Sequence, residues 1–120
     1  MLHPHYQKIS PLAVAAGNAA EGTITTIDAS VTAGALLGAA LELTVGSADT
    51  VVVRIYEGAG TGTADLLHES SIVFTATNDK AVVTLDVPFP FFDTLSFSAQ
   101  ATGAGRTVAV RPFVSTIQVP

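Results

Sequence analysis

The sequence predicts an all-β fold, an antiparallel β-sandwich that is jelly-roll-like and has seven to eight strands. Apolar and polar side chains alternate with a period near two in residues 50–56, 71–75, 81–87, 95–99 and 107–111. This is the period of a strand that buries one face. Turn-forming residues separate these runs, as is typical of antiparallel sheets. A chain of 120 residues without cysteine can bury one core without disulfides.

Residues 1–20 are predicted to form an extended N-terminal arm, and residues 21–120 the β-sandwich domain. Pro4 and Pro11 force extended backbone on the residues that precede them. Residues 13–20 have small side chains, which bury little area. Such an arm would fray in isolation and become ordered on a partner, and simple disorder is the alternative.

Regular structure of the domain is predicted to begin at Gly22, with a strand over residues 23–28, where β-branched residues predominate. Residues 46–49 then form a turn that leads into residues 50–56. Both faces of this later strand are partly apolar. It therefore lies centrally, or its second face meets a neighbouring subunit.

Residues 31–45 are ambiguous between helix and strand. By propensity, residues 35–43 could form a helix. Gly34, Gly38 and the residues after them favour a strand over residues 41–45 that follows a short loop or bulge. We prefer the strand.

The second half of the chain is predicted to consist of strands joined by turns. A flexible Gly/Thr stretch at residues 58–63 leads to a strand over residues 66–76, and a turn at Asn78 and Asp79 leads into residues 80–87. Two further strands follow over residues 95–101 and 107–119. They are joined by a glycine-containing turn.

Prolines are expected to interrupt pairing at two places. Pro88 and Pro90 lack the amide donor of a ladder and should end it, which leaves the neighbouring phenylalanines either to cap the core or to anchor a subunit contact. Pro112 predicts an edge position or a break in the last strand.

Charge is scarce in this chain. Charged residues make up 12% of it, about half the usual fraction, and the net charge is −5. Lys8 and Lys80 are the only lysines that could guard a sheet edge. We therefore expect other chains to cover much of the surface, and a monomer with a Thr-rich surface is the alternative. No basic stripe, apolar span or export signal of the usual form is present, so neither nucleic acid nor a membrane is an expected partner.

No constellation of residues indicates catalysis. His3 and His5 share a face of extended backbone and could bind a metal with His68, but no carboxylate partner is identifiable. The aspartates are mostly single and lie near turns, and no nucleophile elbow or complete phosphate loop occurs. We expect that the protein is not an enzyme and that it binds neither a cofactor nor a metal ion. A lectin-like module is the main rival, with Tyr6, Tyr56 and the Phe89–Phe92 group as its candidate aromatic platform.

Four sequence pieces occur together: VRIYEG at residues 53–58, the Gly/Thr loop before LLHE at residues 66–69, VPFPFFD at residues 87–93, and LSFSA at residues 95–99 with the TGAG turn before VAV at residues 108–110. In the kinds of residues they contain and in their order along the chain, these pieces resemble the small β-sandwich virion proteins encoded beside capsid genes in tailed bacteriophages. The pattern covers about half the chain. Such proteins decorate, or cement, capsids, and similar folds occur in tails and head fibres.

The resemblance implies a structural virion protein that is assembled in the host cytoplasm and docks on the exterior of an icosahedral capsid. It would bridge subunits of the major capsid protein, as a homo-oligomer for which we favour a trimer. The alternatives are a carbohydrate-binding module and a head-fibre or tail component. The residues expected to bind the partner are Leu2, Tyr6, Ile9, Leu12, Val14, Phe89, Phe91 and Phe92.

Overall fold

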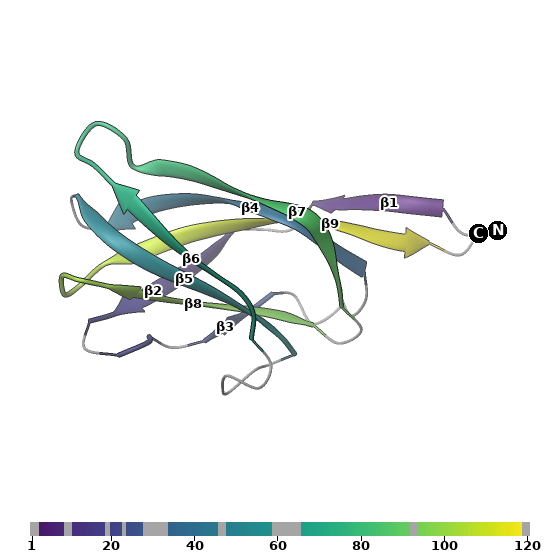
Figure 1. The fold of residues 1–120 in the computed structure, drawn as a ribbon, viewed down its shortest axis with the longest axis horizontal. Coiled ribbons are helices and arrows are strands. Elements are labelled where there is room, and N and C mark those ends of the chain that lie inside the picture. The colour runs from purple at the N-terminus through teal and green to yellow at the C-terminus, as the bar shows by residue number, and fades with distance from the viewer. Residues whose placement is uncertain are drawn as a thin grey trace.

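The fold is all-β, as the alternation predicted (Figure 1). The structure is a computed structural model that describes residues 3–8, 11–18, 20–22, 24–27, 34–45, 48–58, 66–91 and 94–118. Every regular element in these ranges is a strand. The strands are β1 (His3–Lys8), β2 (Leu12–Gly17), β3 (Thr25–Thr26), β4 (Gly34–Val45), β5 (Asp49–Glu57), β6 (Leu66–Phe74), β7 (Lys80–Phe91), β8 (Leu95–Ala101) and β9 (Thr107–Gln118).

The strands form one mixed sheet that nearly closes on itself. Hydrogen-bonded neighbours follow the order β6-β5-β8-β2-β9-β4-β7, with β1 added to β9 and β3 added to β8. We call β1, β2, β9, β4 and β7 the β9 half, and β3, β8, β5 and β6 the β8 half. Strand β2 connects them, because its first residues pair antiparallel with β9 and its last two pair parallel with β8.

The core lies between the two halves. Its buried side chains come from alternate positions of both: Val14, Leu36, Ala39, Leu41, Leu43, Val108, Val110 and Val114 from the β9 half, and Val51, Val53, Ile55, Phe97, Ala99 and Ala101 from the β8 half. This alternation is what the period-two runs predicted, and no second core is present in the described part of the chain.

The ambiguous region is strand β4, which is longer than the strand predicted. Its register shifts between Leu36 and Gly38 against both of its neighbours. The extra residue reverses the alternation, so that Leu36 and Ala39 both face the core. The preferred strand, with a bulge before residues 41–45, is therefore what the structure has, and the helix allowed by propensity is not formed. The bulge also brings Gly38 so close to β7 that an added Cβ would lie 2.3 Å from the Val83 carbonyl oxygen.

Residues 1–20 do not form an arm separate from the folded domain where the structure describes them. Strand β1 pairs along its length with β9, from His3 opposite Gln118 to Lys8 opposite Phe113. Strand β2 is part of the sheet, and Val14 is fully buried in the core. The backbone is extended, as predicted, but its partner is the chain's own β9.

We expect truncation to separate the roles of β1 and β2. Deleting residues 1–20 removes β2 and the buried Val14 side chain, so the variant should lose cooperative thermal unfolding. Deleting residues 1–8 removes only β1 and should leave a folded protein. Circular dichroism melting curves test this expectation. A cooperative transition in the longer deletion would contradict the assignment of β2 to the core.

The prolines do not interrupt the strands in the predicted way. Strand β7 continues through Pro88 and Pro90 to Phe91, although its pairing with β4 stops at Thr84 and resumes at Phe89. The ladder is therefore interrupted next to Pro88, but the prediction that the prolines end it is wrong. Within the described ranges β7 pairs only with β4, and an edge strand tolerates residues that lack a donor. Because the two prolines are two residues apart, both missing donors fall on the same edge.

Pro112 lies inside β9, which runs between β4 and the N-terminal strands. The predicted edge position is therefore wrong. Residues up to Val110 pair with β2, and residues from Phe113 pair with β1. Pro112 thus falls where the ladder on that side is interrupted, as the alternative prediction of a break requires.

The chain turns sharply between β2 and β3. An added Cβ on Gly17 would lie 2.0 Å from the Ala20 carbonyl oxygen, and one on Gly22 would lie 2.3 Å from the Ala15 carbonyl oxygen. Glycine is therefore required at both positions. After the turn, the Gly22 amide donates to Ala99 at 3.0 Å and the chain runs back along β8.

Candidate functional site

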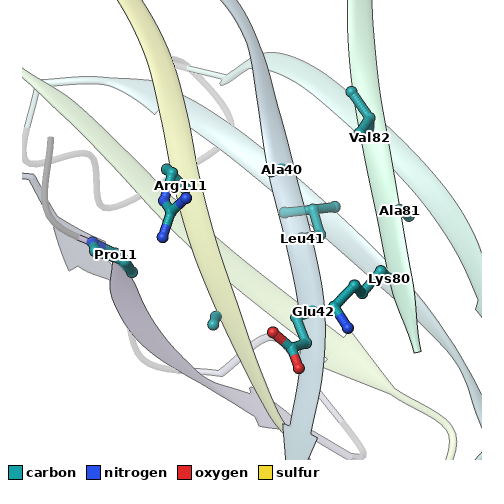
Figure 2. A pocket seen from close by; sticks show the side chains of 9 residues that line it. Pro11, Ala40, Leu41, Glu42, Lys80, Ala81, Val82 and Arg111 are labelled. Carbon is teal, nitrogen blue, oxygen red and sulfur yellow. The ribbon is translucent and has the colours of Figure 1, made fainter. Parts of the chain in front are cut away.

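The outer face of the β9 half contains a hollow of about 490 Å³ (Figure 2). Its lining comes from β4, β7 and β9 and from the residue before β2: Pro11, Ala40, Leu41, Glu42, Lys80, Ala81, Val82, Ala109 and Arg111. We call this set the outer hollow. Leu41 has its side chain in the core, so it lines the hollow through its backbone.

Strand register explains why the surface is hollow at this point. Ala40 lies opposite both Arg111 of β9 and Val82 of β7. In the next row, Glu42 lies opposite Ala109 and Lys80. Ala40 and Ala109 therefore form the floor, and the longer side chains of Glu42, Lys80, Val82 and Arg111 surround it.

The outer hollow is bordered by exposed apolar side chains. Val82 is 65% exposed, and Phe113, one row further along β9, is 41% exposed. Phe113 lies opposite Gly38 of β4. Because glycine has no side chain, it leaves the phenylalanine ring uncovered on that side. An apolar surface that continues across three strands is typical of a face that contacts a partner.

The charges around the outer hollow differ from those of the whole protein. Lys80 and Arg111 are cationic and Glu42 is anionic, whereas the chain as a whole has a net charge of −5. Lys80 Nζ lies 3.9 Å from Asp79 Oδ1, and both side chains are exposed, so this pair contributes little. Within the described residues, Arg111 has no ion-pair partner. The hollow therefore presents cations beside an apolar floor.

The structure does not bring the predicted partner-binding residues together. Val14 and Phe91 are fully buried in the chain's own core, so neither can contact a partner in this conformation. Leu12 and Phe89 are half-buried and pack against that core. The backbone of Tyr6 pairs with Ser115. Leu2, Ile9 and Phe92 lie outside the described residues.

The residues of the outer hollow were not predicted from the sequence. A signal was present in the last strand, where the positions that alternate with buried Val108 and Val110 are Ala109, Arg111 and Phe113. These positions place a small, a cationic and an aromatic residue on one face of the strand. Which neighbouring strands complete that face depends on pairing, and the sequence did not predict that pairing.

The aromatic platform proposed for a lectin is not present at Tyr56. Tyr56 is buried, and its hydroxyl donates a hydrogen bond to a Glu21 carboxylate oxygen, to which the Ser98 hydroxyl also donates. Burial and the Glu21 carboxylate raise the pKa of Tyr56. Burial opposes ionisation of Glu21, but the two hydrogen bonds and nearby Arg54 hold its pKa below the usual value. This cluster ties the start of the β3 segment to β5 and β8.

His68 contacts its own chain. Its Nε2 atom lies 2.6 Å from Ser70 Oγ, and its ring lies 5.9 Å from the Phe89 ring, between the two ends of the sheet. Where the structure describes side chains, no group of three histidines or acidic residues could hold a metal ion. The described residues also include no helix long and apolar enough to cross a membrane.

Comparison with protein-family models, curated proteins and solved structures finds no match to this chain.

Proposed function

We propose that the fold is a jelly roll. The pairing supports this, because β2-β9-β4-β7 and β3-β8-β5-β6 are each consecutive neighbours. Eight strands divided in this way between two four-stranded groups, with only β5 and β6 consecutive in the same group, form the two Greek keys of a jelly roll. Jelly rolls are common in viral capsid proteins and in lectins, which restricts the functions to consider without choosing between them.

We further propose that the protein is a structural virion protein that decorates the exterior of an icosahedral bacteriophage capsid. The outer hollow is the observation that carries this proposal, since it is an exposed apolar surface without a cluster of reactive groups in the described residues. The major capsid protein is the proposed partner. The scarcity of charge supports the same proposal, because a surface with few ions loses little hydration when it is covered.

In the proposed contact, an apolar side chain of the capsid subunit fills the alanine floor, and Val82 and Phe113 lose their exposure to water. Arg111 and Lys80 face acidic groups of that subunit and set its orientation. The single contact is small. Self-association of the protein, and many copies on each shell, would therefore supply the avidity that stabilises the capsid.

The experiment is a co-sedimentation assay with undecorated capsids of the virus that encodes the chain. Val82→Lys should weaken binding about tenfold or more, since burying one valine contributes about 1.5 kcal/mol and the added charge must also be desolvated. Ala76→Lys, in the exposed turn after β6, adds the same charge away from the hollow and should bind normally. Equal binding by both variants would contradict the proposed docking face.

A carbohydrate-binding module remains the alternative, and the same hollow favours it, because Glu42, Lys80 and Arg111 could hydrogen-bond sugar hydroxyls beside an apolar floor. A glycan array distinguishes the two functions. The virion proposal predicts no saturable glycan. A saturable glycan whose binding is lost in Arg111→Ala would support the alternative instead.

A further inference from the structure

The two ends of the sheet are protected to different degrees. An exposed strand edge offers unpaired backbone groups to any other strand, and proteins usually guard such edges with lysine or proline. Edge strand β7 begins with Lys80 and contains Pro88 and Pro90. Edge strand β6, with the sequence LLHESSIVF, contains no lysine, arginine or proline.

Strand β6 pairs with one neighbour only among the described residues. All of its pairing is with β5, from Leu66 opposite Tyr56 to Phe74 opposite Asp49, with a bulge at Leu67 and regular pairing from His68 onward. Its other edge therefore has backbone donors and acceptors without a partner strand in the described ranges. On the same strand, Val73 is 68% exposed, more than any other large apolar side chain that the structure describes.

The polarity of β6 is nearly palindromic. Two leucines begin the strand, four polar residues from His68 to Ser71 form its middle, and three apolar residues end it. In antiparallel pairing with an identical strand, the apolar start of one copy meets the apolar end of the other. A strand of this pattern is complementary to itself.

We propose that β6 pairs antiparallel with β6 of a second copy of this chain, about a two-fold axis at Ser70. This register uses all nine residues of the strand. It aligns Val73 with Leu67 of the second copy, where β6 has a bulge and the leucine packs against its own core, so the exposed valine lies beside the second copy's strand instead of at an open edge. It joins the two β8 halves into one continuous sheet, an isologous contact of the kind most homodimers use.

The positions of the charged residues favour this register over the two registers whose axis is shifted by one residue. An axis at Glu69 would set two carboxylates directly opposite each other, about 5 Å apart, which is unfavourable. An axis at Ser71 would leave Leu66 and Leu67 of each copy without a strand residue opposite them and would set Val73 opposite a glutamate. With the axis at Ser70, Glu69 faces Ser71 of the second copy. Its charge is already compensated, since Arg54 Nε lies 2.8 Å from Glu69 Oε2.

Disulfide trapping tests the register, and the chain contains no cysteine that could interfere. In Ser70→Cys the two thiols would face each other across the axis, with Cα atoms about 4.5–5.5 Å apart, a distance that a disulfide can span. In Ser71→Cys the two residues would be diagonal neighbours about 7–8 Å apart, beyond easy bridging. Mild oxidation should therefore give a covalent dimer of Ser70→Cys and little of Ser71→Cys. Equal trapping, or the reverse preference, would overturn the register.

Analytical ultracentrifugation tests the contact itself. The unmodified protein should sediment as a dimer at micromolar concentration, and Val73→Lys should raise the dissociation constant about tenfold or more. Val82→Lys is the matched control, because it introduces the same residue at an equally exposed valine of the guarded edge strand, and it should remain a dimer. A protein that is monomeric at all concentrations, or a Val73→Lys variant that associates like the unmodified chain, would overturn the proposal.

Discussion

Replacing Asp49 by alanine is expected to lower the free energy of unfolding by about 3–5 kcal/mol, the usual cost of breaking a buried ion pair. The Asp49 carboxylate is buried at the start of β5. It accepts hydrogen bonds from the Thr102 hydroxyl and amide, from the Gly103 amide at 2.9 Å and from Arg106 Nε at 2.8 Å. The substitution would leave the turn between β8 and β9 without its acceptor and Arg106 without its counterion.

Urea denaturation of Asp49→Ala measures this loss directly. Asp79→Ala is the control, since Asp79 is exposed and its nearest cation, Lys80 Nζ, lies 3.9 Å away. The control should change stability by no more than about 0.5 kcal/mol. Similar small effects in both variants would mean that the carboxylate of Asp49 does not hold the turn.

The same carboxylate should make stability depend on pH. The Thr102 hydroxyl, the Gly103 amide and Arg106 hold the pKa of Asp49 far below its usual value, despite burial that acts the other way. An unfolded aspartate titrates near about pH 3.9, so the unfolded chain binds this proton more readily than the folded protein does. The contribution of Asp49 is therefore fully present above about pH 4 and is lost as the pH falls below that value. For Asp49→Asn, the free energy of unfolding plotted against pH should therefore have a lower plateau above about pH 4 than for the unmodified protein, and it should decline less steeply in acid.

Replacing Phe91 by alanine is expected to cost about 3–5 kcal/mol, because its ring is completely buried and the substitution leaves a cavity. Phe89, two residues earlier on β7, is only half-buried and packs against the edge of the core beside His68. Phe89→Ala should therefore cost less, about 1–2 kcal/mol. Urea denaturation of the two variants compares one phenylalanine in the core with one at its margin. Equal losses would contradict this difference in burial.

Most strands could be predicted because their side chains alternate along a single segment. Residues 50–56, 95–99 and 107–111 lie within β5, β8 and β9, and their alternate positions are in the core. Strand β4 was harder to predict, since its bulge changes the alternation within the strand. The effect of the β7 prolines and the edge position considered for Pro112 were misjudged for a related reason. Whether a missing donor matters depends on whether a neighbouring strand is present at that residue, and the sequence of one segment does not contain that information.

The candidate site could be predicted less well than the fold. The outer hollow exists because Ala40, Val82 and Arg111 come from three strands that are far apart in sequence and adjacent in register. The structural role of Asp49 was hard to predict for the same reason. The sequence indicated only a residue near a turn, and its hydrogen-bond partners lie more than 50 residues later in the chain. That the N-terminal segment pairs with its own chain was also hard to predict, for an energetic reason. Small side chains such as those of β2 bury little area individually, but the strand contributes Val14 and two sets of backbone pairs.

The position of β2 determines how the protein would respond to mechanical load. A force applied at the N-terminus would first peel β1 from β9 one residue pair at a time, which requires little force. It would then reach β2, which is fastened to β9 by one part of its length and to β8 by the other. Both sets of bonds must be broken before the halves can separate at this strand, so β2 acts as a clasp. A protein exposed to internal pressure or shear would resist rupture at this clasp after its outermost strand had already detached.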